Sequence, residues 1–236
     1  MNLFIIGASG RVGSIVTPFL KHQHTIRVYD MKAPADTTLD YWAGDLNDYE
    51  NLKAAMAGMD ALLYMAMNVM HTDELTVDHS AFDVNVKGVY FALKAAQAVG
   101  IPHAVHCSSM SVYAGDLNTR YFFDEAMPPD GRDLYGLTKR LGEEVCYNAC
   151  VNYGMSVNAL SMCFPISRER YLEQARLDTP SLPTDAEDVA RLMMAALEYR
   201  NGFQAFQTSG DYANKIINMA KAKRLLGWEP LARPVQ

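Results

Sequence analysis

A glycine-rich loop close to the N-terminus constrains the fold of this chain more than any other feature. Residues 3–6 are apolar and predict a strand, Gly7-Ala8-Ser9-Gly10-Arg11-Val12-Gly13 follows directly, and residues 11–22 have the pattern of a helix. Between a strand and a helix, such glycines permit a tight turn, close approach of the backbone to a pyrophosphate, and close packing of the helix. Free N–H groups at the helix N-terminus attract the anion. A dinucleotide is therefore expected to contact the loop through Gly7, Gly10, Arg11, Val12 and Gly13.

Apolar segments alternate with amphipathic ones along the first two thirds of the chain. Strands are expected at 3–6, 25–29, 41–43, 61–65, 103–107 and 156–161, and helices at 11–22, 49–57, 78–99 and 132–153. Strands that alternate with helices pair in parallel and bury both faces of the sheet. Right-handed crossovers then give an α/β, Rossmann-type doubly wound parallel sheet.

The last third of the sequence is less regular. A helix is expected over 186–200, a strand over 205–208, and a helix over 215–226 that ends at Gly227. This portion is too small to bury a core of its own. We therefore expect residues 1–236 to form a single domain, in which about 163–236 contribute a small lobe on the substrate side.

Charge and cysteine usage limit the partners of the protein. The chain has 21 Lys and Arg residues against 27 Asp and Glu, a net charge of −6, which argues against binding nucleic acid through bulk charge. No apolar run approaches the ~18 residues that a membrane span needs. The four cysteines lack the spacing of a zinc site or a disulfide framework, as is usual in a reducing compartment. We expect a cytoplasmic protein without a metal, whose partner is a small-molecule substrate and not nucleic acid or a membrane.

An acidic residue ends the second expected strand. Asp30 can accept hydrogen bonds from an adenosine ribose and would repel a 2′-phosphate, which favours NAD over NADP. Arg11 points the other way, because a guanidinium near that ribose could bind the phosphate. NAD is the cofactor that we expect.

Tyr135 and Lys139 are four residues apart on an expected helix, so their side chains share a face. A nearby ammonium favours the phenolate and lowers the pKa of a tyrosine, which makes the pair a candidate acid/base unit. Ser108 and Ser109 stand at the end of the fifth expected strand, at the sheet edge where ligands bind. The glycine loop, the serines and the Tyr/Lys helix are therefore expected to converge on one crevice.

Together these motifs resemble those of the extended short-chain dehydrogenase/reductase superfamily, in its NAD-dependent epimerase/dehydratase family. The resemblance extends over nearly the whole chain. It includes the segments Gly44-Asp45-Leu46, Met65-Ala66-Met67, Asn85-Val86-Lys87-Gly88, Val112-Tyr113, Asp188-Val189-Ala190 and Leu226-Gly227-Trp228-Glu229-Pro230.

The resemblance implies a role for each matching residue. Ser109 would be the catalytic serine, Tyr135 the acid or base, and Lys139 the group that lowers the pKa of Tyr135 and holds the nicotinamide ribose. Further cofactor contacts are implied for Asp45, Leu46, Met65, Ala66, Met67, Asn85, Tyr135 and Pro165. Substrate contacts are implied for Ser109, Met110, Ser111 and Arg168.

The substrate is less constrained than the cofactor. Only 97 residues follow Lys139 (140–236), which favours a small free substrate over a nucleotide sugar. The loop from Met162 to Arg168 resembles that of a compact uronate dehydrogenase branch, in which Arg168 could clamp a sugar carboxylate. Met110-Ser111 replaces the Asn-His pair of that branch, so a neutral sugar, a lactone or another hydroxy compound stays open.

The leading hypothesis is an NAD-dependent oxidoreductase that oxidises or reduces a hydroxyl or carbonyl of a small free sugar, sugar acid or related compound. One alternative is a sugar epimerase that retains its NAD. Another is a non-catalytic dinucleotide-binding sensor or interaction protein, although such proteins typically lose the Tyr or the Lys. The helices expected over 78–99 and 132–153 resemble the pair through which members of the family form homodimers, so a homodimer is expected.

Overall fold

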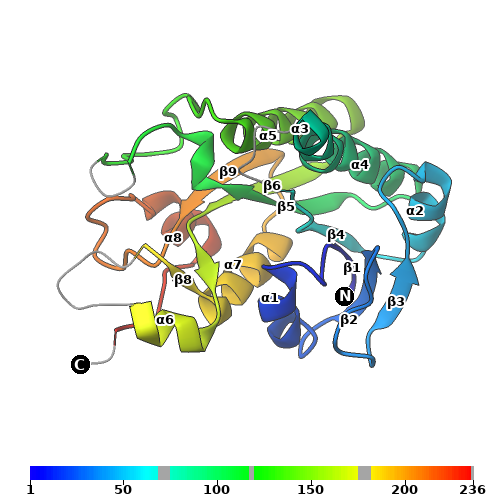
Figure 1. Cartoon of the computed structure of the whole chain (residues 1–236), viewed down its shortest axis with the longest axis horizontal. Helices are drawn as coiled ribbons and strands as arrows, with labels where there is room; N and C mark the ends of the chain where they lie inside the picture. The colour runs from blue at the N-terminus through cyan, green and yellow to red at the C-terminus, as the bar shows by residue number, and fades with distance from the viewer. Residues whose placement is uncertain (69–74, 117–119, 175–181, 235–236) are drawn as a thin grey trace.

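Seven parallel strands form the main sheet of the protein. The computed structural model describes residues 1–68, 75–116, 120–174 and 182–234. The sheet order is β3-β2-β1-β4-β5-β6-β9 (Figure 1). The strands are β1 (Asn2–Ile6), β2 (Thr25–Asp30), β3 (Asp40–Ala43), β4 (Ala61–Tyr64), β5 (His103–Ser109), β6 (Ser156–Met162) and β9 (Phe203–Thr208). This order confirms the predicted Rossmann-type sheet, in which ligands bind where the strand order reverses, between β1 and β4.

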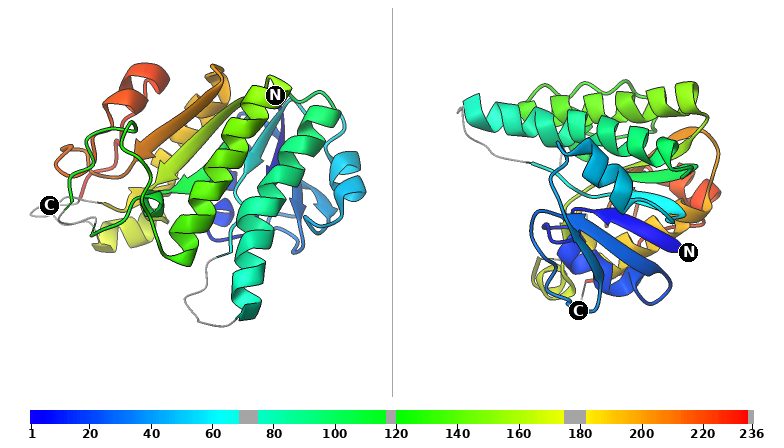
Figure 2. Two further views of the ribbon diagram at one scale, coloured as in Figure 1. Left: turned by 90° about the horizontal axis from the view of Figure 1, so that it is seen from above. Right: turned by 90° about the vertical axis from the view of Figure 1, so that its right-hand side faces the viewer.

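Helices cover both faces of the main sheet (Figure 2). One face carries α1 (Gly13–Leu20) and α7 (Ala186–Glu198), and the other carries α2 (Tyr49–Ala55), α4 (Val89–Ala98) and α5 (Leu134–Tyr153). In the described part of the chain, no helix combines the length and the apolar character that crossing a membrane requires.

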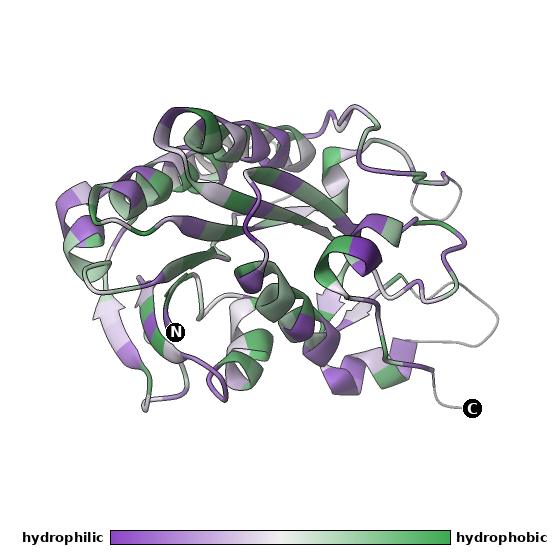
Figure 3. Ribbon diagram, turned by 180° about the vertical axis from the view of Figure 1, so that it is seen from behind, coloured by the Kyte–Doolittle hydropathy of each residue, from purple (hydrophilic) through white to green (hydrophobic). Residues whose placement is uncertain are grey.

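The residues of β1 show why two helical layers form. Leu3 and Ile5 pack into the core beneath α1 and α7, whereas Phe4 and Ile6 pack into the core beneath α2, α4 and α5. All four are at most 2% exposed. Because successive side chains of a strand point to opposite faces, an apolar strand needs cover on both sides. Figure 3 shows the resulting pattern, with hydrophobic colour on the strands and hydrophilic colour on the outer sides of many helical turns.

The helix expected over 78–99 consists of three consecutive segments. These are α3 (Leu75–Phe82), the π-helical turn η1 (Asp83–Gly88) and α4. A π-helical turn within an α-helix is rare, and where such a turn occurs it is often at a functional site. Here it carries Asn85, one of the predicted site residues.

The helix α5 carries the predicted Tyr/Lys pair. It begins after Asp133, whose side chain accepts a hydrogen bond from the Gly136 N–H at 2.8 Å, and it ends at Gly154 with a φ of 66°. An acidic N-cap and a left-handed glycine are the usual boundaries of a helix. They place Tyr135 in the first turn, close to the sheet edge.

The last third of the chain also contains smaller elements. These are β7 (Pro165–Ile166), α6 (Arg168–Gln174), β8 (Thr184–Asp185) and α8 (Ala220–Leu226), with β7 paired to β8. The helix expected over 215–226 begins only at Ala220. The reason is Asp211, whose Oδ2 accepts the backbone N–H groups of Ile216 at 2.7 Å and Ile217 at 3.2 Å. These bonds hold the preceding segment as a loop.

The end of the described chain is fixed to α7. The Trp228 indole donates to the Asp188 carbonyl at 2.9 Å, and the Asp188 carboxylate accepts the N–H groups of Leu231 and Ala232. Trp228 is among the largest fully buried side chains. The region from about 163 onward therefore supplies α7 and β9 to the main layers, besides its smaller elements.

Candidate active site

Two adjoining cavities follow the carboxyl ends of the strands. The larger cavity has a volume of about 930 Å³ and runs from the end of β2 to the start of η1. We call it the groove. The smaller, of about 250 Å³, lies between η2 (Met110–Val112) and the segment that follows β6 and is called the pocket. Arg11, Met65 and Met67 line both cavities, so the groove continues into the pocket.

Most residues predicted to bind the cofactor line these cavities. The lining of the groove includes Gly7, Gly10, Arg11, Asp30, Asp45, Leu46, Met65, Ala66 and Met67. The lining of the pocket includes Val12, Tyr135 and Pro165. The predicted residues Gly13, Asn85 and Lys139 are buried behind these walls.

Two glycines give the loop after β1 its path. Gly7 has a φ of 87°, and a Cβ there would overlap the backbone of Ala66 at the end of β4. A Cβ at Gly13 would overlap the carbonyl of Gly7. The loop can therefore lie flat against β4 and expose its backbone to the groove at the N-terminus of α1. This is the cradle that a pyrophosphate requires.

Asp30 lies on the wall of the groove at the end of β2. Its carboxylate accepts the backbone N–H groups of Ser9 and Lys32, each at 3.1 Å. These bonds fix it where it can accept ribose hydroxyls and repel a 2′-phosphate. The charge of Arg11 acts on Tyr135, at the other end of the groove. The described residues therefore fit NAD.

Ser109 and Tyr135 meet where the groove and the pocket join. Ser109 ends β5, and its hydroxyl both accepts the Ser111 N–H at 3.1 Å and lies 3.1 Å from the Ser111 hydroxyl. Tyr135 lines the pocket together with Ser109. The Tyr135 hydroxyl lies 4.0 Å from the Met67 sulfur. The predicted serine, tyrosine and strand end are thus brought together.

Burial dominates the acidity of the Tyr135 phenol. Desolvation raises the pKa of Tyr135 to about 12, while the hydrogen bond with Ser109 and the positive charge of Arg11 act to lower it. A tyrosine with such a pKa is protonated at neutral pH. Without further stabilisation of the phenolate, Tyr135 is a proton donor.

Lys139 lies buried beneath the Tyr135 ring. It is 1% exposed, and its Nζ donates a hydrogen bond to the Cys107 carbonyl at 2.8 Å. It lies 5.8 Å from the centre of the Tyr135 ring, and burial lowers the pKa of Lys139 to about 8. Ser109 and Arg11 act to lower the pKa of Tyr135, and the same effect of Lys139 stays a prediction.

Asn85 is a buried connector between segments and does not line the groove. Its amide nitrogen donates to the Asn68 carbonyl at 2.9 Å and to the Thr138 hydroxyl at 3.0 Å, and its oxygen accepts the Asn68 N–H. All hydrogen-bonding groups of the side chain are used in this way. Asn85 thus fixes the loop after β4 to α5, and its contact with the cofactor stays a prediction.

The far wall of the pocket is largely apolar. Besides the predicted Met110 and Ser111, it includes Met162 and Phe164, which were not predicted individually. Phe164 is 54% exposed and has a φ of 40°, a left-handed conformation that non-glycine residues rarely adopt. Because ligands bind at the carboxyl ends of parallel strands, the end of β6 could have indicated both residues.

Arg168 lies outside the lining of the pocket. Its Nη1 is 3.4 Å from Oδ2 of Asp185, the residue that caps α7. Its guanidinium carbon also lies 5.9 Å from the centre of the Tyr171 ring. The structure therefore pairs Arg168 with an acidic residue of the chain, and its contact with a substrate stays a prediction.

Comparison with protein families gives one match that spans most of the chain. The model of the "NAD dependent epimerase/dehydratase family" matches residues 3–180.

Curated relatives cover a shorter stretch. The chain is 31% identical over 144 residues to N-acetyl-alpha-D-glucosaminyl-diphospho-ditrans,octacis-undecaprenol 4-epimerase of Escherichia coli O157:H7. It is 31% identical over 153 residues to 3-beta-hydroxysteroid dehydrogenase of Mycolicibacterium neoaurum. Each match covers 61% of this chain and 42% of the relative. The chain thus spans less than half the length of these relatives.

Solved structures show the same fold. A mutated uronate dehydrogenase superposes with a TM-score of 0.82 at 21% identity, over 98% of this chain and 82% of the other. Glucuronic acid dehydrogenase from Chromohalobacter salexigens gives a TM-score of 0.82 at 22% identity, over 98% and 85%. These neighbours include sugar-acid dehydrogenases, and others, such as UDP-N-acetylglucosamine 4-epimerase from Bacillus cereus, are epimerases.

Proposed function

Because the chain belongs to the NAD dependent epimerase/dehydratase family, we propose that it is an NAD-dependent dehydrogenase that oxidises a hydroxyl group, or reduces the carbonyl, of a small free substrate. The observation that carries the proposal is that Ser109 and Tyr135 both line the pocket that continues from the groove. When bound in the groove, NAD would supply the hydride acceptor.

Residues of the groove would hold this cofactor in an extended form. The backbone at Gly7 and Gly10 would bind the pyrophosphate, and Asp30 the adenosine ribose. Met65 and Met67 line the region that the groove and the pocket share. The reactive end of the cofactor would then lie beside Tyr135.

Tyr135 would move the proton in this reaction. In the direction of reduction, its neutral phenol donates a proton to the substrate oxygen, and in oxidation its oxygen accepts the hydroxyl proton. Ser109 would orient the substrate oxygen and share its developing charge. The bond from Ser109 and the charge of Arg11 both favour the phenolate that the oxidation needs.

The pocket favours a substrate without charge. Among its described lining residues, Arg11 is the only charged one, and Met67, Met162 and Phe164 supply broad apolar surface. A sugar carboxylate would need a free cation, but Arg11 also lines the groove in which the cofactor would bind, and Arg168 is paired with Asp185. We therefore propose a neutral hydroxy compound with an apolar face, ahead of a free uronate.

A second candidate is an epimerase, favoured by the 31% identity to a 4-epimerase. It would use the same residues but would retain its NAD and return the hydride to the other face of the substrate. Such an enzyme should copurify with NAD and produce no net NADH. A third outcome, NAD binding without turnover of any compound, would indicate a sensor or interaction protein.

The test is NADH formation with NAD and a panel of free uronates, neutral sugars, lactols and apolar cyclic alcohols. Wild-type protein is compared with Tyr135→Phe, which keeps the ring but removes the proton-transferring oxygen. We expect turnover to fall by about 10²–10⁴-fold in the variant, the usual contribution of a general acid or base. NAD affinity, measured by calorimetry, should stay within about twofold of wild type. Unchanged turnover in the variant would refute this mechanism.

We also propose that the protein forms a homodimer through α4 and α5. Tyr90 on α4 and Leu137, Tyr147 and Val151 on α5 are 36–63% exposed, and the two helices lie side by side (Figure 2). Exposed apolar side chains on adjacent helices are typical of an interface. Light scattering should give a dimer for wild type and a monomer for Val151→Glu. A monomeric wild type would contradict the proposal.

A further inference from the structure

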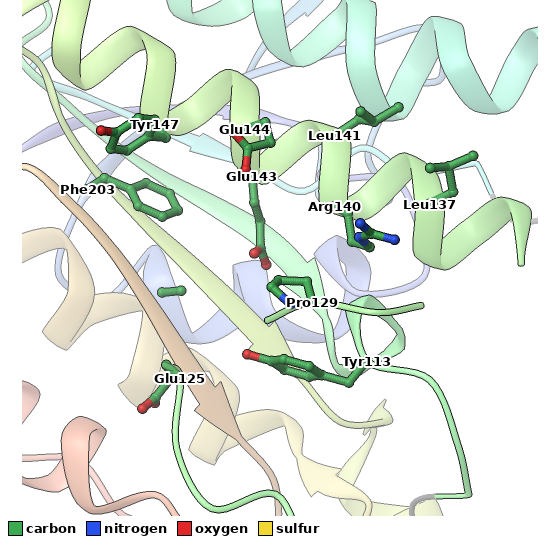
Figure 4. A pocket seen from close by; sticks show the side chains of 11 residues that line it. Tyr113, Glu125, Pro129, Leu137, Arg140, Leu141, Glu143, Glu144, Tyr147 and Phe203 are labelled. Carbon is green, nitrogen blue, oxygen red and sulfur yellow. The ribbon is translucent and has the colours of Figure 1, made fainter. Parts of the chain in front are cut away.

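Another cavity lies beneath α5, apart from the joined groove and pocket (Figure 4). We call it the second cavity. It has a volume of about 370 Å³ and is bounded by α5, the segment around Tyr113 and the start of β9. Glu143 and Glu144 both line it. In Figure 4 the Glu143 side chain extends from α5 toward the strands, whereas Glu144 stays beside the helix.

Glu143 connects this cavity to the wall of the pocket. It is 8% exposed, and its Oε1 accepts hydrogen bonds from the hydroxyls of Ser108 and Ser161, the latter at 3.0 Å. Ser108 lines the pocket and precedes the catalytic candidate Ser109. A carboxylate at this depth is rare unless a charge or hydrogen bonds compensate its burial.

Lys139 is the buried cation that lies one helical turn before Glu143 on α5. Lys139 is as deeply buried as the hydrophobic residues of the core. An ammonium group at such a position needs a negative group nearby. Glu143 is the carboxylate of the described residues whose charge acts on Lys139 to raise its pKa. The two groups thus lie on one face of α5, between the pocket and the second cavity.

The other titratable groups around Lys139 carry no charge at neutral pH. Burial raises the pKa of the Cys107 thiol to about 12 and that of Cys146 well above its usual value. Burial also holds the pKa of His106 well below its usual value, so this imidazole is neutral. The Tyr135 phenol is protonated as well. Glu143 is the remaining group whose charge acts to raise the pKa of Lys139.

We infer that Glu143 is a positioning residue of the active site, whose carboxylate, held by Ser108 and Ser161, keeps Lys139 in its ammonium form. The inference rests on the proposed function, because an ammonium at Lys139 matters to the reaction only if Tyr135 transfers a proton there. The second cavity gives Glu143 its contact with solvent, through which its own proton can exchange.

The pKa values of the two groups move toward each other. Burial lowers the pKa of Lys139 to about 8, and Glu143 opposes that change. Burial raises the pKa of Glu143, while the bonds from Ser108 and Ser161 and the charge of Lys139 lower it. The neighbouring Glu144 acts to raise it. Removing the charge of Glu143 should therefore let the pKa of Lys139 fall further.

The direct test is an NMR titration of Lys139 in protein labelled with ¹³C-lysine, without added NAD or substrate. The Lys139 signal is assigned by its loss in Lys139→Met. Glu143→Gln keeps an oxygen acceptor for both serines and removes the charge. We expect the pKa of Lys139 to fall by about 1 in this variant, as for the loss of a nearby opposite charge.

Two further variants control for changes in packing. Glu144→Gln removes a charge from the same cavity but not from the pair, and should leave the pKa of Lys139 unchanged or slightly higher. Ser161→Ala loosens Glu143 without touching the pocket, and should lower the pKa of Lys139 by less than Glu143→Gln does. The inference is overturned if Glu143→Gln titrates like wild type, or if Glu144→Gln lowers the pKa equally.

The consequence for catalysis is measured separately. In Glu143→Gln the alkaline limb of the pH profile of kcat/KM should move to lower pH, whereas in Glu144→Gln it should stay in place. If no compound of the panel is turned over, the proposed function fails while the titration still decides the pairing. If turnover is found and the limb does not move, the role of Glu143 in positioning is refuted.

Discussion

The groove and the pocket adjoin each other but are built in different ways. The groove depends on the close approach of the loop after β1 to the end of β4, at the edge of the sheet where β1, β2 and β4 end, with Asp30 fixed by two N–H groups. The pocket is lined by five separate segments, and Met67, Ser109, Tyr135 and Phe164 are among its residues. The first is a property of the strand order, and the second is a property of individual residues.

This difference determines how each site responds to substitution. A cavity made by close backbone approach tolerates almost no added atoms, because the strands on both sides are fixed by the sheet. A cavity made by side chains can change its shape with each residue and so change its substrate. We therefore expect changes in the groove to affect folding and cofactor binding, and changes in the pocket to affect mainly substrate selection.

The largest effect is expected at Gly7. An Ala there would adopt a φ of 87° and overlap the backbone of Ala66. We expect Gly7→Ala to lower the free energy of unfolding by more than about 3 kcal/mol, beyond the range of ordinary substitutions, and to abolish NAD binding measured by calorimetry.

Gly58 offers a matched control. Its φ is 79°, yet a Cβ would meet nothing within 4 Å. Gly58→Ala should cost only about 1–2 kcal/mol, the penalty of the left-handed conformation itself, and leave NAD affinity unchanged. Chemical denaturation of Gly7→Ala and Gly58→Ala measures the loss in free energy of unfolding of each variant. Equal losses would show that conformation, and not close approach to β4, sets the requirement at Gly7.

A smaller effect is expected at Asp30, where the groove uses a side chain. Asp30→Asn keeps an acceptor oxygen but removes the charge, so NAD should bind about 10-fold more weakly, as when a hydrogen bond to a charged group is weakened. The loss for NADP should be smaller, because the repulsion of its 2′-phosphate is relieved. Asp36→Asn, an exposed residue paired with Lys21 outside the groove, is the control. A variant that loses affinity for both cofactors equally would contradict the assignment of Asp30 to the ribose.

The same contrast explains how much of the molecule could be predicted from its sequence. The glycine loop and the Tyr135/Lys139 pair were predictable because each is a local pattern whose spacing fixes its geometry. The alternation of apolar and amphipathic segments predicted six of the seven strands of the sheet, and the strand expected over 205–208 is the seventh, β9. Features of this kind depend on neighbours in sequence.

Other features depend on partners that are distant in sequence. Asn85 is bonded to Asn68 and Thr138, 17 and 53 residues away, and no local pattern distinguishes this use from a cofactor contact. Arg168 pairs with Asp185, and the two residues are too far apart in sequence for the spacing of one helix to predict their contact. The direction of the Lys139 ammonium, toward the Cys107 carbonyl, likewise requires the packing of α5 on β5.

The pocket can be tested at Phe164 through a substitution that should improve the fold while harming the site. Phe164→Gly relieves a φ of 40°, and the free energy of unfolding should rise by about 1 kcal/mol if the strain is that of a left-handed residue. Loss of the aromatic ring should raise KM for an apolar substrate by about 10-fold, as for lost apolar contacts in a binding pocket.

Asn214 separates these two effects. It is the other described non-glycine residue with a positive φ, 50°, and it lies outside the pocket. Asn214→Gly should leave KM unchanged and gain less stability, because asparagine tolerates this conformation better than phenylalanine and its side chain accepts the Met219 N–H. A rise in stability and in KM at Phe164, with neither at Asn214, would show that strain is kept in the pocket because the ring contacts the substrate. An unchanged KM in Phe164→Gly would remove Phe164 from the binding surface and with it much of the argument for an apolar substrate.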